Sequence, residues 1–339
     1  MRVLVTGGAG YIGSHTCVVL LEKGHEVVII DNLSNSKMEA VRRIEGISGK
    51  KVVFYQADVC DKDALRKIFS ENEIDAVIHF AGLKAVGESV RIPLRYYENN
   101  LISTLSLVEV MQENKVNNII FSSSATVYGN PASVPISEDF PLSTTNPYGT
   151  TKLFIERILT DVAFANPDFN PILLRYFNPV GAHECGLIGE DPAGIPNNLV
   201  PYITQTAVGK LDHINVFGAD YPTKDGTGVR DYIHVMDLAE GHVAALDLYR
   251  RESNCGLRTY NLGTGVGYSV LEIIHAFEKA LGRSLPFVLG ARRPGDIPEC
   301  YADPKKAREE LHWESKKTLE DMCVDALRWQ EKNPNGYEE

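Results

Sequence analysis

Near the amino end, Thr6-Gly7-Gly8-Ala9-Gly10-Tyr11-Ile12-Gly13 joins a short apolar run, residues 3–6, to a stretch with helical periodicity. Glycines let a backbone turn sharply and approach a pyrophosphate, and the helix that follows offers free N–H groups and a partial positive charge. A glycine triplet alone would also suit a flexible turn. Its place between a strand and a helix is the context that indicates a dinucleotide-binding loop.

Five more runs with the composition of buried strands follow this loop, at residues 26–31, 52–55, 76–80, 118–122 and 172–176. Helix-length stretches such as residues 61–71 and 94–114 separate them. Strands rich in Val and Ile that alternate with helices predict a parallel sheet covered on both faces. The sequence therefore predicts an α/β fold with a doubly wound, Rossmann-type sheet.

The pattern loosens after Gly181 into stretches rich in Pro and Gly, at residues 190–201 and 221–228, and helical runs return near 270–281 and 318–330. We expect residues 1–180 to form the dinucleotide-binding domain. Residues 181–339 are predicted to form a smaller, mixed α/β substrate lobe, with chain excursions between the two.

Composition excludes several classes of protein. The 339 residues carry a formal net charge of −11, which argues against a nucleic-acid binder because such proteins need a basic face. No apolar run approaches the roughly 20 residues of a membrane span. The opening residues show no signal-peptide pattern, so a cytoplasmic protein is expected. Six separated cysteines and nine scattered histidines show no metal-site spacing, so no metal is predicted.

Two acidic residues follow predicted strands. Asp31 lies 21 positions after Gly10, where a carboxylate accepts hydrogen bonds from a ribose 2′-OH and repels a 2′-phosphate. This position favours NAD over NADP. Asp58 follows the third run, where it would either meet the adenine edge or cap the helix that begins near Lys62.

Tyr148 and Lys152 form a Tyr-x-x-x-Lys pair, which places a phenol and an ammonium on one face of a helix. Free tyrosine has a pKa near 10, and a neighbouring cation favours the phenolate. Lowering that pKa to about 7 requires roughly 4 kcal/mol of differential stabilisation. The pair is therefore a candidate proton-abstracting base, although the same spacing also occurs on ordinary helix surfaces.

The glycine loop together with Tyr-x-x-x-Lys resembles the extended short-chain dehydrogenase/reductases. Further segments resemble one family among them, the UDP-galactose 4-epimerases (UDP-glucose 4-epimerases), over nearly the whole chain. These segments are residues 80–89 (FAGLKAVGES), 121–129 (FSSSATVYG), 174–181 (LRYFNPVG), 194–199 (GIPNNL), 225–234 (DGTGVRDYIH), 292–296 (RRPGD) and 300–303 (CYAD).

The resemblance implies reversible epimerisation at C4 of UDP-glucose and UDP-galactose, through a transient 4-keto sugar and enzyme-bound NADH. Oxidation and reduction at C4 avoid the carbanion that direct deprotonation would require. Tyr148 would be the base for the 4-OH, Lys152 would hold the phenol ionised, and Ser124 would share the proton. NAD would be held tightly, because it is regenerated in each turnover.

The resemblance also implies the residues that bind each ligand. Cofactor contacts would come from Gly7, Gly10, Tyr11, Ile12, Gly13, Asp31, Asn32, Asn35, Ser36, Asp58, Val59, Phe80, Ala81, Lys84, Asn99, Ser122, Tyr148, Lys152, Tyr176 and Phe177. Substrate contacts would come from Ser124, Tyr148, Asn178, Asn198, Leu199, Phe217, Arg230, Tyr232, Arg293, Asp296 and Cys300. Among these, Arg230 and Arg293 would pair with the diphosphate, because a guanidinium matches phosphate oxygens.

Cys300 departs from part of that family, in which a tyrosine walls the sugar pocket. A cysteine is smaller, so the hypothesis is that UDP-N-acetylglucosamine and UDP-N-acetylgalactosamine also react. The alternative is that neighbouring side chains fill the space.

Three other functions stay open from the sequence. One is a related nucleotide-sugar 4,6-dehydratase, although Ala125 and Thr126 stand where those enzymes carry an acidic pair. Another is a non-catalytic NAD-binding regulator, and the third is a net dehydrogenase. Family members are commonly homodimers whose helices form a bundle. Apolar positions within residues 94–116 and 154–162 suit that arrangement and would suit a buried core equally well.

Overall fold

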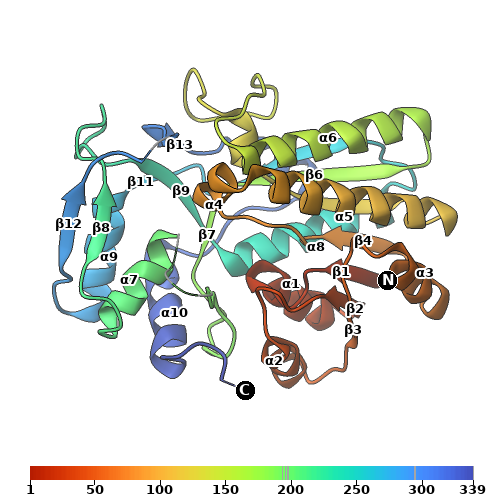
Figure 1. Ribbon diagram of the computed structural model, residues 1–339, viewed down its shortest axis with the longest axis horizontal. Coiled ribbons are helices and arrows are strands. Elements are labelled where there is room, and N and C mark those ends of the chain that lie inside the picture. The colour runs from red at the N-terminus through yellow and green to blue at the C-terminus, as the bar shows by residue number, and fades with distance from the viewer. Residues whose placement is uncertain (193, 195, 197, 294, 339) are drawn as a thin grey trace.

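The computed structural model describes residues 1–192, 194, 196, 198–293 and 295–338. Its centre is a seven-stranded parallel sheet in the order β10-β6-β5-β4-β1-β2-β3 (Figure 1). The strands are β1 (Arg2–Thr6), β2 (Glu26–Asp31), β3 (Val53–Gln56), β4 (Ala76–His79), β5 (Asn118–Ser124), β6 (Asn170–Tyr176) and β10 (Arg258–Leu262). The predicted doubly wound parallel sheet is confirmed. All six expected strands are present, and β5 runs two residues further than the apolar run suggested.

Helices cover both faces of this sheet because its strands are apolar on both sides. Val3 and Val5 belong to the core shared with α1 (Tyr11–Glu22), α2 (Met38–Ser48) and α8 (Val235–Arg251). Leu4, on the opposite side of the same strand, belongs to the core shared with α3 (Lys62–Glu71), α5 (Pro93–Glu113) and α6 (Pro147–Ala165). The short α4 (Val86–Arg91) leads into α5.

The second half of the chain contributes to this first assembly. Helix α8 packs on the same face as α1 (Figure 1). Strand β10 extends the sheet beyond β6. The chain therefore returns to the central sheet between residues 235 and 262.

The rest of the second half forms smaller sheets and three helices. Strand β9 (Val229–His234) pairs with β7 (Asn178–Val180), β11 (Gly267–Ser269) and β13 (Glu299–Cys300), and β8 (Ile214–Phe217) pairs with β12 (Phe287–Gly290). Only β11 runs antiparallel to β9. Helices α7 (Leu199–Ala207), α9 (Val270–Leu281) and α10 (Leu319–Lys332) enclose a separate apolar core. A 3₁₀ turn, η1 (Ala125–Tyr128), follows β5, and a π-helical turn, η2 (Ala307–Leu311), precedes α10.

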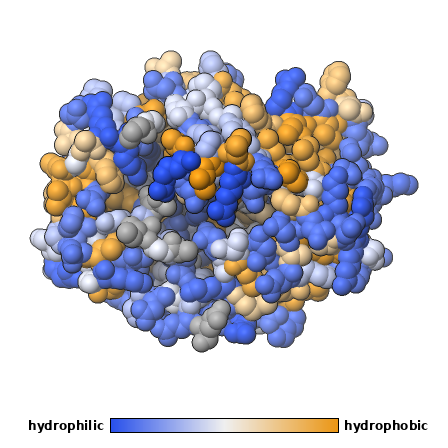
Figure 2. All heavy atoms as spheres, in the orientation of Figure 1, coloured by the Kyte–Doolittle hydropathy of each residue, from blue (hydrophilic) through white to orange (hydrophobic). Residues whose placement is uncertain are grey.

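The surface is mostly polar, with apolar atoms gathered over β12 at the left edge and over the α5–α6 layer at the upper right (Figure 2). Val288 and Leu289 are the most exposed apolar residues of β12. Leu94, Leu105 and Phe154 are exposed on α5 and α6. Within the described ranges, no helix combines the length and apolarity that a membrane crossing needs.

Candidate active site

The glycine loop lies at the carboxyl edge of the sheet, between β1 and the first turn of α1. Gly7 adopts the left-handed region with φ +69°, and a Cβ there would stand 2.9 Å from the Ala81 backbone nitrogen. A Cβ on Gly13 would lie 2.3 Å from the Gly7 carbonyl oxygen. Gly10 caps α1 without any side chain, so the first N–H groups of this helix are left to an incoming ligand. The loop therefore needs its glycines and presents a cradle suited to a pyrophosphate.

Asp31 closes the same edge at the end of β2. Its carboxylate accepts hydrogen bonds from Ala9 N at 3.0 Å, Leu33 N at 2.9 Å and the Ser36 hydroxyl at 2.7 Å. A carboxylate offers about four lone-pair sites, so three donors leave capacity for one more. That remaining capacity and the negative charge fit a ribose hydroxyl rather than a phosphate. Asn35 lies beside Ser36 in the same loop after β2.

Asn32 and Asp58, both expected to contact the cofactor, are joined by a hydrogen bond of 2.9 Å from Asn32 Nδ2 to Asp58 Oδ2. The alternative role of Asp58 as a helix cap is wrong. Asp61 caps α3 by accepting hydrogen bonds from Asp63 N and Ala64 N, whereas Asp58 binds the Cys60 backbone N–H at 2.8 Å. Val59 beside it is buried in the core. The Asp58 carboxylate thus faces the loop that leaves β2.

Lys84 lies next to Tyr11 of the loop, with its Nζ 6.0 Å from the centre of the Tyr11 ring. Lys84 Nζ forms an ion pair of 3.1 Å with Glu190, and Asn198 Nδ2 donates to the same carboxylate at 2.8 Å. Tyr11 donates its hydroxyl to the Gly181 carbonyl at 2.7 Å. Glu190, which the sequence reading missed, therefore links a residue expected on the cofactor side to one expected on the substrate side.

The remaining cofactor candidates line the carboxyl ends of β4, β5 and β6. The Phe80 ring packs 4.8 Å from the His242 ring, and Ala81 N donates to Thr6 Oγ1 at 3.2 Å. Asn99 hydrogen-bonds its neighbour Asn100 on α5. Ser122 and Tyr176 share a short hydrogen bond between their hydroxyls, and Phe177 follows in a buried apolar cluster. Ile12 packs against the core beneath α1.

Tyr148, Lys152 and Ser124 come together where α6 crosses the end of β5. Asn146 caps α6 by accepting a hydrogen bond from Gly149 N, which starts the helix just before Tyr148. Lys152 Nζ donates to the Ser122 carbonyl at 2.6 Å and stands 5.9 Å from the centre of the Tyr148 ring. Ser124 is the last residue of β5. The predicted trio is thus assembled by one helix and one strand end.

The chain's own groups do not bring the pKa of Tyr148 below its ordinary value. Burial raises the pKa of Tyr148 to about 12, and a hydrogen bond with Ser124 opposes that rise. Burial also lowers the pKa of Lys152 to about 7, while Glu156 acts in the opposite direction. Desolvation disfavours both charged forms, because Lys152 is buried and Tyr148 is partly buried. Further positive charge near the phenol is needed to make it a base at neutral pH.

The Ser124 hydroxyl is arranged to donate its proton. Its oxygen accepts hydrogen bonds from Thr126 N at 3.2 Å and from Thr126 Oγ1 at 3.0 Å. A hydroxyl has two acceptor lone pairs and one proton, so the O–H is left for a phenolate or a sugar oxygen. Ser124 therefore caps η1 and still has a proton to share.

Apart from Ser124 and Tyr148, the expected substrate residues lie around the smaller sheets and at the start of α7. Asn178 and Tyr232 are register partners in β7 and β9, and Arg230 and Cys300 are register partners in β9 and β13. Farther along, Arg293 pairs with Asp296 at 3.0 Å and stacks 5.0 Å from the centre of the Phe217 ring. Leu199 begins α7, directly after Asn198.

Several of these residues have internal partners. Arg230 donates to the Val229 carbonyl at 2.8 Å, so part of its guanidinium is already occupied. Burial raises the pKa of Tyr232 to about 12, against the lowering effect of Arg230 and Arg293. Of the motif segments, Ile195, Asn197 and Pro294 lie outside the described residues.

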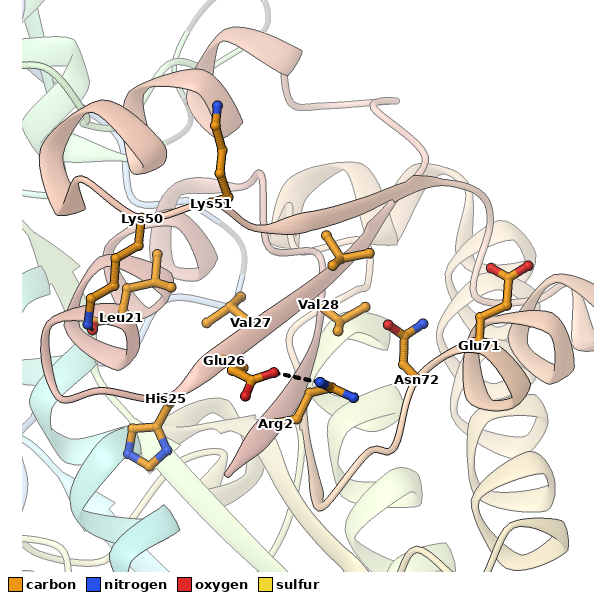
Figure 3. Close-up of a pocket in the computed structure, with 11 residues that line it drawn as sticks. Arg2, Leu21, His25, Glu26, Val27, Val28, Lys50, Lys51, Glu71 and Asn72 are labelled. Atoms are coloured by element: carbon orange, nitrogen blue, oxygen red, sulfur yellow. Dashed lines mark hydrogen bonds and ion pairs between the residues drawn. The ribbon is translucent and has the colours of Figure 1, made fainter.

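Two shallow hollows in the structure lie at the opposite edge of the sheet. One, of ≈ 280 Å³, is lined by residues that begin β1 and β2, where Arg2 and Glu26 form an ion pair of 2.7 Å (Figure 3). The other lies among residues before β4, β5 and β6. Ligands of doubly wound sheets bind at the carboxyl ends of the strands, so neither hollow belongs to the site. Across the described part of the chain, no cluster of His, Cys, Asp or Glu is arranged to hold a metal ion.

Comparisons with known proteins agree with this arrangement. Residues 4–326 match the family model described as GDP-mannose 4,6 dehydratase. The UDP-glucose 4-epimerase of Bacillus subtilis is 62% identical over 337 residues, which cover 99% of both chains. A crystal structure of the Bifidobacterium longum UDP-glucose 4-epimerase with NAD⁺ and UDP is 58% identical, with a TM-score of 0.97 over 99% of this chain and 100% of that one.

A more distant structure is similar as well. The UDP-Glc/GlcNAc 4-epimerase of Campylobacter jejuni is 38% identical, with a TM-score of 0.84 over 98% of this chain and 99% of that chain. High identity along the full length, together with the shared fold, leads to one conclusion. The chain belongs to the family of UDP-glucose 4-epimerases, within the wider family that the GDP-mannose 4,6 dehydratase model describes.

Proposed function

We propose that this protein interconverts UDP-glucose and UDP-galactose by inverting C4, with NAD as its tightly held cofactor. The observation that carries the proposal is the meeting of Ser124, Tyr148 and Lys152 beside the glycine loop. The glycine cradle and the Asp31 carboxylate suit NAD. When bound, NAD takes up and returns the C4 hydrogen, and its positive ring favours a nearby phenolate.

The chain's own residues handle the proton. The Tyr148 oxygen takes the proton of the 4-OH as the carbonyl forms at C4, and it returns the proton when the carbonyl is reduced from the other face. Lys152 supplies positive charge next to the phenol, and Ser124 donates a hydrogen bond to the sugar oxygen or to the phenolate. Most substrate binding energy must fall on the UDP part, because the keto sugar has to turn over in place.

Contacts to UDP are assigned to the second lobe. Arg230 and Arg293 would meet the diphosphate, and Phe217 would lie beside the uracil. The stacking of Arg293 on Phe217 supports this assignment, since it places a cation and an aromatic face at one point of the lobe. Residues 1–180 would thus bind the cofactor and residues 181–339 the sugar nucleotide. Helix α8 and strand β10 of the second range pack with the first.

A 4,6-dehydratase is the second candidate, since the matching family model carries that description. Such an enzyme needs an acid and a base to eliminate water across C5 and C6. Ala125 and Thr126 follow Ser124 here, and the Thr126 hydroxyl is engaged with Ser124. Formation of a 4-keto-6-deoxy sugar nucleotide from UDP-glucose would favour this candidate over the epimerase.

We also propose that the acetamido sugars UDP-GlcNAc and UDP-GalNAc are substrates. Cys300 pairs with Arg230 and packs in the apolar cluster that contains Ala125 and Phe177, next to Ser124. A thiol at this position leaves more space beside the hexose than a tyrosine ring. The Campylobacter jejuni relative, described as acting on both Glc and GlcNAc forms, supports the proposal.

The central test is an assay without added NAD. The purified protein should convert UDP-galactose to UDP-glucose, and its heat-denatured supernatant should contain NAD. Tyr148→Phe should retain the NAD and lose at least about 10³-fold in turnover, because general acid–base catalysis contributes about 10²–10⁴-fold. Full activity of that variant would mean that another group removes the proton.

Assembly and location are further proposals. We infer a homodimer, supported by the exposed apolar residues of α5 and α6, among them Leu94, Leu105 and Phe154. We also infer a cytoplasmic location, since all six cysteines carry free thiols.

A further inference from the structure

A buried ion pair lies beneath the catalytic trio and takes no part in the chemistry described above. Arg175 Nε donates to Glu156 Oε1 at 2.9 Å and Arg175 Nη2 donates to Glu156 Oε2 at 2.6 Å, a bidentate contact. The two side chains are only 5% and 4% exposed. A buried charge pair of this kind is a poor source of stability, because desolvation offsets most of its attraction. The pair is therefore of more interest for where it lies relative to the active site than for its contribution to stability.

The pair holds the chain on both sides of Ser124. The Ser123 hydroxyl donates to Glu156 Oε1 immediately before Ser124. Arg175 Nη1 donates to the Tyr128 hydroxyl at 3.1 Å, four residues after it, and the guanidinium stacks 5.0 Å from the Tyr128 ring centre. The segment that contains Ser124 is thus hydrogen-bonded, before and after Ser124, to the Arg175–Glu156 pair.

The pair also fixes the catalytic helix. Glu156 lies one turn beyond Lys152 and two turns beyond Tyr148, on the buried face of α6. Arg175 lies on β6 opposite Ser123 of β5, and the next register pair is Ser124 and Tyr176. One ion pair therefore sets the position of α6 relative to the strand end that carries Ser124.

We propose that Glu156 and Arg175 are positioning residues of the active site, which hold Tyr148 and Lys152 of α6 in register with Ser124. The proposal rests on the proposed epimerase function and adds a role that the reacting groups do not supply themselves. Near-attack geometry tolerates little error, since a displacement of 1 Å can cost about 10²-fold in rate. A charged, bidentate contact fixes both distance and orientation, which an apolar contact does not.

Electrostatics gives Glu156 a second effect on Lys152. The groups around the ammonium are Tyr148 and Glu156 on α6, neutral His79 on β4, and the Phe121 ring and Ser122 carbonyl on β5. Tyr176 on β6 lies near Tyr148. Only Glu156 among them is an anion. Its removal would lower the pKa of Lys152 further and leave the Arg175 cation uncompensated. With NAD bound, whose positive ring favours the phenolate near neutral pH, the charged form of Lys152 would become rarer and the Tyr148 phenolate would then form at higher pH.

The experiment compares four variants with the unaltered protein. Glu156→Gln removes the negative charge of the pair, and Glu156→Asp keeps the charge on a shorter side chain. The double variant Glu156→Met with Arg175→Met replaces the pair by apolar packing. Tyr249→Phe is the matched control, because its hydroxyl joins the same strands, β5 and β6, through the Ile119 and Asn170 carbonyls at their other ends. Melting temperature, kcat, KM and NAD content are measured for each.

We expect Glu156→Gln to lower kcat about 10- to 100-fold, with KM for UDP-galactose changed less than about threefold and NAD retained. Glu156→Asp should recover part of the rate. The double Met variant should regain its melting temperature without regaining kcat. Tyr249→Phe should lose stability and keep kcat. If the double variant regained both stability and rate, the pair would be merely structural and the proposal would be overturned.

A spectroscopic titration tests the proposal independently of turnover. The ultraviolet difference between each protein and its Tyr148→Phe counterpart reports the ionisation of Tyr148 alone. In the NAD-bound proteins, Glu156→Gln should move this titration to higher pH, whereas Tyr249→Phe should leave it in place. An unaltered protein that interconverts no UDP-sugar would refute the proposed function while leaving this titration valid. An unchanged titration and rate in Glu156→Gln would refute only the positioning role.

Discussion

Lys152 is a charged side chain held where charge is unfavourable. It is buried against the Phe121 ring, and burial lowers its pKa to about 7 from an ordinary value of 10.5. A lysine whose pKa is lowered in the folded state destabilises that state wherever the lysine is protonated in both the folded and the unfolded protein. The loss of folding free energy is therefore largest below pH 7. The cost declines as pH rises toward 10.5, because only the unfolded state then still binds the proton.

Lys152→Met should therefore produce a more stable but inactive protein. We expect a gain of about 1–4 kcal/mol in the free energy of unfolding near pH 6, less the lost hydrogen bond to the Ser122 carbonyl. The gain should shrink as the pH approaches 10. Denaturant unfolding at a series of pH values measures it, and Lys62→Met on the exposed side of α3 is the control. A variant less stable than its parent at pH 6 would contradict the assigned burial cost.

Cys300 gives a prediction about selectivity. Cys300→Tyr should reduce turnover of UDP-GalNAc at least about tenfold while changing that of UDP-galactose less than about threefold. A ring in place of the thiol would occupy the space assigned to the acetamido group, and steric exclusion of that kind acts on one substrate only. Parallel assays of both substrates measure it, with Cys300→Ala as the small control. A parent protein that turns over no acetamido sugar would end the proposal.

For single residues, spacing and motif were sufficient to predict the site residues that lie close together in the chain. Tyr148 and Lys152 share a helix face, and Ser124 ends a strand. The sequence could not reveal Glu190 or the Glu156–Arg175 pair, because their partners are brought close only by the fold. It also could not show that burial raises the pKa of Tyr148, since burial cannot be read from spacing.

The element that depends most on glycine is the turn from β1 into α1. Gly13→Ala would place a methyl group 2.3 Å from the Gly7 carbonyl, and backbone cannot yield as a side chain can. The turn would have to shift and the cradle would widen. We expect the variant to be purified with at least about tenfold less NAD and with its fold retained, as chromatography of released nucleotide and circular dichroism would show.

Gly46→Ala provides the control for that change, because a methyl group there meets no atom within 4 Å on α2. Its NAD content should equal that of the unaltered protein. If Gly13→Ala also kept its NAD, the loop would not be the pyrophosphate site.

Elements with strong local signals were predicted within one or two residues. The run at residues 26–31 and the helix at 270–281 coincide with β2 and α9, and Asp61 marks the start of α3. Strand β10 and helix α8 were not assigned to the central sheet. Their own sequences suit a strand and a helix, but which sheet they join depends on pairing with β6 and packing on α1.

For the whole molecule, the largest consequence lies in the exposed apolar residues of the α5–α6 layer. Leu94 is 80% exposed and Phe154 47% exposed, and the Phe154 ring lies 6.1 Å from that of Tyr97 across the seam between the helices. Exposed apolar patches of this kind mark interfaces. We expect sedimentation to give twice the 37.5 kDa mass of one chain.

The double variant Leu105→Asp with Phe154→Asp should sediment as a single copy, because buried carboxylates would oppose association. Val288→Asp on β12 is the matched control and should leave the mass of the unaltered protein unchanged. A parent that is monomeric at micromolar concentration would refute the assembly proposal.

The overall architecture followed from the alternation of strands and helices. Chain excursions between the lobes were expected, but the return of α8 and β10 to the central sheet was not assigned. This return has a consequence for synthesis on the ribosome. Until residue 262 has emerged, β6, with all seven residues buried in the finished molecule, has an open edge. A gene fragment truncated at residue 180 would leave that edge bare for good. It would yield inclusion bodies rather than a free-standing cofactor module, and any dissection of this protein should keep α8 and β10 attached.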